Sequence, residues 1–352
     1  MPDILIHHEP LVNFGREIMK AAQIPADSAD LVATALGASN LRGVDSHGFQ
    51  LLPFYIQQVR DGNVDIKTQG HVASENATCL TYDGENGIGQ VIARNCCGHA
   101  IRIAKEHGIA AVVARESNHF GAAAFWAQRM SAAGLIGIVM CNASPLVAPW
   151  QGKEKRFGTN PICMALPGPD QWLLDMATTT VAMGKIFKAS LSGEPAIPAG
   201  WAIDKNGVPT TDTAAAMEGW PMPLGGYKGY GLAMMVEILC AVLSGGAMSL
   251  ELGGIRIKDR PMRVSQFFMA IDVERFMPRH EFTARMRSLI EMMKSSEPAT
   301  GYDEVLVAGE PEWRSEEQRR VSGIPLSEGI WKIMTDTAAE LGVAIPAVDT
   351  IV

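Results

Sequence analysis

Two histidines stand in short polar segments where side chains can reach a small substrate. His47 follows Ser46 in the segment 45–48, and His119 lies in the segment 117–121. A hydroxyl beside an imidazole can move a proton, because histidine titrates near neutral pH. A single loop histidine is more often an ordinary surface residue, and the position of His47 alone leaves that alternative open. Two such segments together favour acid–base chemistry.

Both histidine segments follow elements with clear periodicity. Apolar residues at helical spacing between 31 and 41, closed by Gly43, predict a helix that ends just before Ser46. The apolar run 109–114 predicts a buried strand that leads directly into the segment of His119. Further elements predicted from pattern are strands at 78–82 and 135–141 and helices at 90–106 and 122–133. This alternation predicts an α/β fold.

The second half of the chain is less regular. Glycine and proline punctuate residues 192–223, which we expect to form a long ordered loop in which Trp201 and Trp220 pack. After it the pattern predicts a strand at 267–271 and helices at 281–294 and 330–341. We expect the helices of both chain ends to pack together as a second lobe.

Composition narrows the class of function. The 352 residues are 47% hydrophobic and carry a net charge of −8, with lysine and arginine scattered along the chain. Scattered basic residues argue against a nucleic-acid partner. The six cysteines lack CxxC spacing, which favours free thiols over a metal site. The N-terminus lacks a secretion pattern, and the longest apolar run, 232–243, is too short to span a bilayer. We therefore expect a cytoplasmic protein that binds a small molecule and no membrane.

Two glycine-rich segments could hold a dinucleotide. Gly87 and Gly89 fit the G-x-G-x-x-A fingerprint of a Rossmann fold, but Glu116 comes 29 residues after Gly87 rather than about 20. A tight turn with close helix packing is the alternative. In the segment 224–231, Lys228 and Gly229 open an apolar helix whose N-terminus would favour an anion. We expect this helix to be buried; a flexible turn before it is the alternative.

Asp175 ends a short apolar run and is followed by hydroxyl residues such as Thr178. A carboxylate in that place can bind ribose hydroxyls. It can equally cap the N-terminus of a helix. Spacing alone leaves both roles open.

Taken together, these segments resemble the malate/L-lactate dehydrogenase family of the non-Rossmann type, whose relatives include ureidoglycolate and sulfolactate dehydrogenases, 2,3-diketogulonate reductase and cyclic-imine reductases. The matching segments are 42–48, 117–121, 142–145, 157–161, 175–177 and 223–231. The resemblance implies an α/β fold with a central mixed sheet and helices. It also implies a helical lobe for substrate and dimerisation from residues 1–75 and 276–352, and a nicotinamide-cofactor domain from residues 76–275.

The resemblance further implies an NAD- or NADP-dependent oxidoreductase that interconverts a 2-hydroxy acid and a 2-oxo acid. His47 would donate or accept the proton, with Ser46 in its hydrogen-bond relay and His119 across the cleft. Family members are homodimers with active sites near the subunit interface. The cofactor-binding positions implied are Ser144, Thr159, Asp175, Met176, Ala177, Thr178, Lys228, Gly229, Gly309 and Glu310.

One position departs from the family pattern. Leu51 stands where the family has an arginine expected to bind the substrate carboxylate, and leucine cannot form that bidentate contact. Reduction of a cyclic imino acid or a diketo sugar acid is therefore kept as an alternative. A metal-dependent hydrolase or lyase is a remote alternative, because no HxH or HExxH spacing occurs. A nucleotide-binding relative without activity is a further one, against which both histidines argue.

Overall fold

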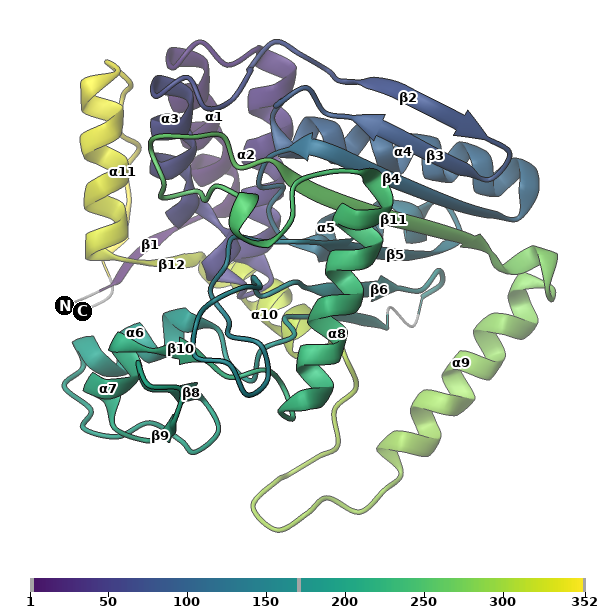
Figure 1. Ribbon diagram of the computed structural model, residues 1–352. Helices are drawn as coiled ribbons and strands as arrows, with labels where there is room; N and C mark the ends of the chain where they lie inside the picture. The colour runs from purple at the N-terminus through teal and green to yellow at the C-terminus, as the bar shows by residue number, and fades with distance from the viewer. Residues whose placement is uncertain (1–2, 170–171, 351–352) are drawn as a thin grey trace.

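A seven-stranded sheet forms the centre of the molecule in the computed structural model, which describes residues 3–169 and 172–350 (Figure 1). Its strand order is β2–β3–β4–β11–β5–β6–β7. The bounds are β2 (His71–Asn76), β3 (Cys79–Asp83), β4 (Ile109–Ser117), β5 (Leu135–Cys141), β6 (Ile162–Ala165), β7 (Leu173–Met176) and β11 (Val264–Asp272). The strands predicted at 78–82, 109–114, 135–141 and 267–271 are confirmed.

The sheet is mixed and is not a Rossmann sheet. Only β3 and β4 pair in parallel, and every other neighbouring pair is antiparallel. The late strand β11 lies between β4 and β5, where Phe268 pairs with Val112 on one side and Val139 on the other. All three of these side chains are buried, because the central strands are covered on both faces.

Two helices cover one face of the sheet. They are α4 (Gly89–His107) and α5 (Ala123–Ala132), and both confirm their predictions. Their alanine- and cysteine-rich inner faces pack with Trp126 and Phe268 in the larger core. Small residues on these faces let the helices approach the sheet closely.

The opposite face is covered by α8 (Tyr227–Glu237), which continues into a π-helical turn (Ile238–Val242). Val236 and Cys240 pack on Phe267 of β11. The expectation that this helix is buried is wrong, since a row of apolar side chains faces solvent: Met234, Met235, Ile238, Val242 and Leu243. An all-round apolar pattern cannot distinguish burial within one chain from burial against a second chain.

The two chain ends meet in a second core. A small antiparallel sheet has the order β12–β1–β13, and helices from both ends pack beside it (Figure 1). The bounds are β1 (Asp3–Ile6), β12 (Ile324–Ser327), β13 (Asp349–Thr350), α1 (His8–Ala21), α2 (Ala26–Leu41), α3 (Leu52–Arg60), α10 (Glu310–Ser322) and α11 (Glu328–Glu340). The helix predicted at 330–341 corresponds to α11. The division into domains at residues 75 and 275 stays a prediction.

Residues 192–223 form more structure than the long loop expected from their glycines and prolines. With α6 (Met183–Leu191) they build a small unit around its own apolar cluster, against which Trp201 packs. Its elements are β8 (Ala202–Ile203), β9 (Pro209–Thr210), α7 (Thr213–Glu218) and β10 (Trp220–Pro221). The strands contain only two residues each, too few for a sequence pattern to reveal.

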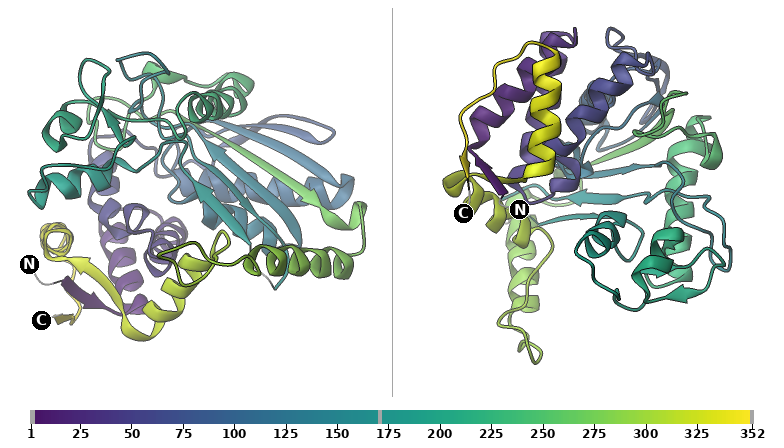
Figure 2. Two further views of the ribbon diagram at one scale, coloured as in Figure 1. Left: turned by 90° about the horizontal axis from the view of Figure 1, so that it is seen from below. Right: turned by 90° about the vertical axis from the view of Figure 1, so that its left-hand side faces the viewer.

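One helix stands apart from the body. The helix α9 (Arg279–Lys294) has no buried residue, and Figure 2 shows it projecting with the loop that follows it. Its bounds match the helix predicted at 281–294. Among the described residues, no helix is both long and apolar enough to cross a lipid bilayer.

Candidate active site

The turn that carries Ser46 and His47 is held in place by its neighbours. After α2 ends, Asp45–His47 form one short 3-10 turn. The amide of Asn40 donates to the Asp45 carboxylate at 2.6 Å, and the Arg319 guanidinium donates to it at 2.7 Å. The side chains of Ser46 and His47 are therefore presented from a fixed backbone.

The segment of His119 is fixed by close backbone packing. The side-chain amide of Asn118 donates to the carbonyl of Gly87 at 2.8 Å. A Cβ at Gly89 would lie 2.3 Å from the carbonyl oxygens of both Asn118 and His119. Gly89 thus permits α4 to begin against this segment, which is the tight-packing role left open for the Gly87–Gly89 pattern.

The two histidines face each other. Their ring centroids are 5.6 Å apart, with 24° between the planes. Ser46 Oγ lies 2.9 Å from His47 Nδ1, which is hydrogen-bond distance. The structure therefore brings Ser46, His47 and His119 together as the sequence predicts.

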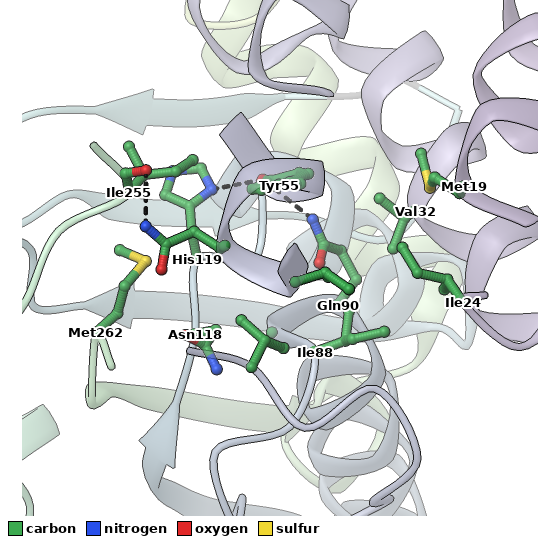
Figure 3. Close-up of a pocket in the computed structure, with 14 residues that line it drawn as sticks. Met19, Ile24, Val32, Tyr55, Ile88, Gln90, Asn118, His119, Ile255 and Met262 are labelled. Carbon is green, nitrogen blue, oxygen red and sulfur yellow. Dashed lines mark hydrogen bonds between the residues drawn. The ribbon is translucent and has the colours of Figure 1, made fainter. Parts of the chain in front are cut away.

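The proton on His119 can be assigned from its partners. The backbone N–H of Gly121 donates to Nδ1 at 3.2 Å, and a backbone N–H can only donate. Tyr55 Oη lies 2.6 Å from the same nitrogen and accepts a hydrogen bond from Gln90 at 3.1 Å (Figure 3). Nδ1 is therefore an acceptor, and the proton of the neutral ring resides on Nε2.

Tyr55 was not among the residues predicted from sequence. It lies on α3, two residues after Pro53, and its hydroxyl reaches His119 across 64 positions of sequence. The only sequence signal was its place on the first turn of a helix next to the His47 segment. No spacing rule connects it with His119.

Enclosure by protein keeps both rings neutral. Burial lowers the pKa of His47 below its ordinary value. Burial, followed by repulsion from His47, lowers the pKa of His119 to about 3. A neutral imidazole can accept a proton from an alcohol, so His47 is suited to act as a base in its resting state, whereas His119 Nδ1 is already an acceptor.

The histidines open into a cavity of about 740 Å³. Eight of the thirteen site residues predicted from sequence line it: Ser46, His47, His119, Ser144, Thr159, Asp175, Ala177 and Gly309. The other five do not line it: Met176, Thr178, Lys228, Gly229 and Glu310.

These five residues have other surroundings, and Met176 is the last residue of β7. Thr178 donates to the carbonyl of Thr159, and Gly229 packs so closely on Leu224 and Thr178 that a Cβ would clash. Glu310 forms an ion pair with Lys294. Lys228 is exposed at the start of α8. A cofactor role for these residues stays a prediction.

Asp175 has a helix-capping contact, and its ribose-binding role stays a prediction. It lies in β7, one residue before the strand ends, and accepts a hydrogen bond from the backbone N–H of Ala124, in the first turn of α5, at 2.9 Å. It therefore caps a helix, although that helix is α5 and not the segment after Asp175. Burial raises the pKa of this carboxyl to about 6.

A cation outside the residues predicted from sequence also lines the cavity. Arg42 is 6% exposed, and none of its guanidinium nitrogens makes a hydrogen bond. Its guanidinium lies 5.5 Å from the centre of the Trp313 ring. Leu51, by contrast, is 7% exposed and packs in the core of the chain ends.

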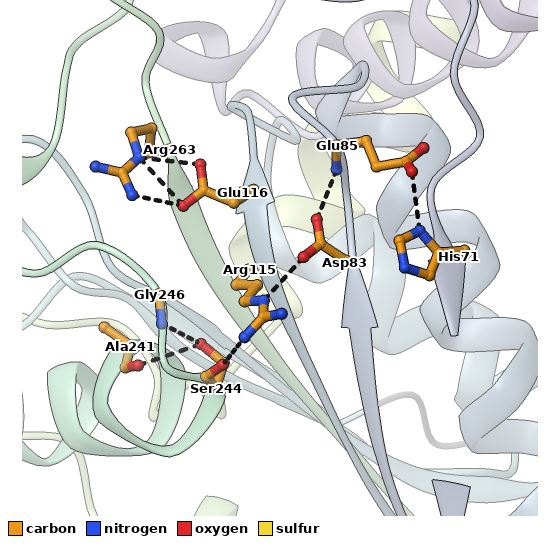
Figure 4. Close-up of polar contacts among 9 residues, drawn as sticks. All are labelled: His71, Asp83, Glu85, Arg115, Glu116, Ala241, Ser244, Gly246 and Arg263. Atoms are coloured by element: carbon orange, nitrogen blue, oxygen red, sulfur yellow. Dashed lines mark hydrogen bonds and ion pairs between the residues drawn. The ribbon is translucent and has the colours of Figure 1, made fainter. Parts of the chain in front are cut away.

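The Rossmann interpretation of Gly87 and Gly89 is excluded by the place of Glu116. Its carboxylate binds Arg263 through both oxygens, at 2.7 and 2.9 Å (Figure 4). Beside it, Arg115 bridges Asp83 and the carbonyl of Ser244. These contacts fasten the end of β4 to the turn after the π-helical segment and to the residue before β11, and Glu116 does not line the cavity.

Among the described residues, no group of three or more histidine, cysteine, aspartate or glutamate side chains could hold a metal ion. All six cysteines are free, and Cys79 alone among them is exposed. The metal-dependent alternative therefore has no ligand set within residues 3–169 and 172–350.

Comparison with known proteins gives one family across the chain. Residues 6–335 match the family described as malate/L-lactate dehydrogenase. A malate dehydrogenase of Pyrococcus horikoshii is 37% identical over 349 residues, covering 97% of this chain and 96% of the relative. An L-sulfolactate dehydrogenase of Methanocaldococcus jannaschii is 36% identical over 94% of this chain and 95% of the relative. The solved structure of a sulfolactate dehydrogenase from that organism aligns with a TM-score of 0.91 at 35% identity, covering 97% of this chain and 98% of the other.

Proposed function

Because this chain belongs to the malate/L-lactate dehydrogenase family and its relatives are dehydrogenases that act on CH–OH groups, we propose that it interconverts a 2-hydroxy acid and a 2-oxo acid with NAD or NADP. The observation that carries the proposal is the pair of neutral histidines that face each other across one cavity. A proton acceptor is required at the hydroxyl oxygen when an alcohol is oxidised, and histidine meets that need.

The cavity fits the nicotinamide end of such a cofactor. It is large enough, at about 740 Å³, for a ring and ribose beside a small acid. Asp175, Thr159 and the backbone at Gly309 would hold the cofactor, and Ser144 would lie next to them. When bound, the nicotinamide supplies or accepts the hydride. The protein aligns the partners and excludes water.

His47 is the proposed proton donor and acceptor. Its Nδ1 lies within hydrogen-bond distance of Ser46 Oγ, so Nε2 is left for the substrate oxygen. In oxidation, the neutral ring takes the hydroxyl proton; in reduction, the protonated ring returns it to the carbonyl oxygen. The lowered pKa of His47 favours the accepting form in the resting enzyme.

His119 is the proposed orienting residue. With Nδ1 accepting from Gly121 and Tyr55, its Nε2–H can donate a hydrogen bond to the same substrate oxygen. A neutral donor at that place polarises the carbonyl without competing for the proton. Tyr55 and Gln90 keep this tautomer in place.

We further propose a homodimer that is formed through α8. The exposed apolar row along this helix, with Met235 and Ile238 at its middle, is the kind of surface that a second copy covers. A dimer would bury this apolar face, which accounts for a helix whose sequence is apolar on almost every side.

The test follows nicotinamide absorbance, with NADH and NADPH separately, against 2-oxo acids, diketo sugar acids and cyclic imino acids. We expect turnover with 2-oxo acids. His47→Ala should reduce turnover at least a hundredfold while nucleotide binding, measured by fluorescence, stays within a few fold. Unchanged turnover in His47→Ala would remove His47 from the mechanism. Turnover confined to cyclic imino acids or diketo sugar acids would replace the proposed reaction by the alternative.

A further inference from the structure

The Arg42 guanidinium is a buried cation without a hydrogen-bonded counter-ion. It is 6% exposed, and its Nε, Nη1 and Nη2 atoms make no hydrogen bond. Asp175 lies within electrostatic reach, yet no hydrogen bond or ion pair joins the two side chains among the described contacts. A buried charge is stable only when it is paired, and a guanidinium matches a carboxylate in shape. Arg42 therefore lacks a paired anion, and the carboxylate of a substrate bound in the cavity can fill that place.

Arg42 is also the only lysine or arginine among the described residues that line this cavity. Two carboxylates, Asp175 and Glu312, line it as well. Leu51, which replaces the expected arginine, lies in the core of the chain ends and adds no charge. Arg42 can therefore pair with one carboxylate of a substrate, and a second carboxylate would meet the negative charge of Asp175 and Glu312.

A second, smaller cavity, the recess, adjoins this cavity behind His119. The linings of the two cavities share His119, Ile255 and Met262, and Figure 3 shows these residues on the side opposite Met19, Ile24 and Val32. Apart from the shared residues, the apolar side chains that line it are Met19, Ile24, Val32, Val59, Val64 and Ile88. Its volume is about 40 Å³, which is room for about three water-sized groups.

The polar groups of the recess are not suited to an anion. The hydroxyl of Tyr55 and the amide of Gln90 are used in holding His119. The two polar atoms of its lining that make no hydrogen bond are carbonyl oxygens, Gln58 Oε1 and Asn118 Oδ1. Carbonyl oxygens repel a carboxylate, because both are acceptors. No permanent charge lies in the lining.

We propose that the substrate is a 2-oxo or 2-hydroxy acid with a single carboxylate, bound by Arg42, and an uncharged, largely apolar side chain that occupies the recess behind His119. The inference rests on the proposed function and narrows its substrate class. It separates this chain from relatives named for malate and sulfolactate, both of which carry a second anion.

A matched pair of substrates tests the recess in the unaltered protein. Oxaloacetate and 4-methyl-2-oxopentanoate differ in that two oxygens of a carboxylate replace two methyl groups of the same shape. We expect kcat/KM to be at least about a hundredfold higher for 4-methyl-2-oxopentanoate, because a buried unpaired carboxylate is strongly disfavoured. Equal or better turnover of oxaloacetate would overturn the inference and leave the proposed function intact. No turnover with any 2-oxo acid would remove the proposed function, and this inference with it.

Variants of Arg42 test the carboxylate contact. Arg42→Gln should raise KM for 4-methyl-2-oxopentanoate at least about a hundredfold, and Arg42→Lys, which keeps the charge, should recover part of that loss. Binding of NADH or NADPH should change less than threefold in both. Arg115→Gln is the control, since Arg115 is a more exposed arginine that lies outside the cavity. A loss confined to kcat or to thermal stability, with KM unchanged, would assign Arg42 a structural role and refute the contact.

Discussion

Replacing His119 with asparagine should flatten the pH dependence of folding stability. The pKa of the His119 ring is lowered from 6.5 to about 3 in the folded protein, with burial as the main cause. At pH 7 the ring is neutral in both states, so the folded state loses nothing. As pH falls below 6.5, the unfolded chain takes up a proton that the folded chain refuses, and stability is lost progressively down to about pH 3.

The magnitude follows from the two pKa values. Between pH 7 and pH 5, proton binding to the unfolded state raises the logarithm of the unfolding equilibrium constant by about 1.4. This change lowers the free energy of unfolding by about 2 kcal/mol. This is an upper bound, because one side of the ring faces the cavity and water there reduces the effect of burial. His119→Asn removes this contribution and keeps a small polar side chain.

Urea unfolding, followed by tryptophan fluorescence, measures the free energy of unfolding at pH 7 and at pH 5. The drop between the two pH values is then compared between the variant and the unaltered protein. The drop between the two pH values should be smaller in His119→Asn than in the unaltered protein by 1 to about 2 kcal/mol. His280→Asn is the matched control, because His280 is exposed on α9 and water reaches it in both states. An identical drop in His119→Asn and the unaltered protein would refute the enclosure of His119, and with it the assignment of a neutral ring.

The remaining predictions concern single side chains. Tyr55→Phe removes the hydroxyl that bonds His119 Nδ1 and should lower kcat about tenfold to a hundredfold with little change in KM, as measured by steady-state kinetics. Because burial lowers the pKa of His47, kcat/KM for oxidation of a 2-hydroxy acid should stay level from pH 8 to about 6.5 and fall only below it; an acid limb above pH 7 would contradict this. Trp126→Ala should reduce the free energy of unfolding by about 3–5 kcal/mol in urea titrations, since the ring is fully buried. Ile238→Glu, at the start of the π-helical turn after α8, should convert a dimer to monomer in sedimentation, and an unchanged mass would place the interface elsewhere.

Four of the seven strands of the sheet could be predicted because their patterns are local, whereas β2, β6 and β7 were not predicted. Residues 135–141 read as a strand from composition alone, and β5 has those bounds. The order of the strands could not be predicted, since nothing near residue 264 indicates that β11 lies between β4 and β5. Pairing partners depend on the whole chain, and a periodicity of two reports only which face is buried.

Some residues of the candidate site could likewise be predicted from local sequence, and others could not. Ser46, His47 and His119 carry recognisable local sequences, and the structure brings them together. Tyr55 and Arg42 act through contacts with residues distant in sequence, so their importance depends on the fold. The absence of an arginine at Leu51 was visible in the sequence, whereas the unpaired guanidinium of Arg42 was not.

The central place of β11 affects how this protein folds while it is being synthesised. A ribosome delivers β4 and β5 long before residues 264–272, so the two strands must wait with unpaired edges until most of the chain has emerged. Those edges carry apolar runs such as 109–114, which pair readily with other chains. We expect folding to be slow, and the central sheet to assemble only after β11 has left the ribosome, because contacts between distant segments form late. A fragment that stops before residue 264 should therefore aggregate, although it contains every other strand of the main sheet.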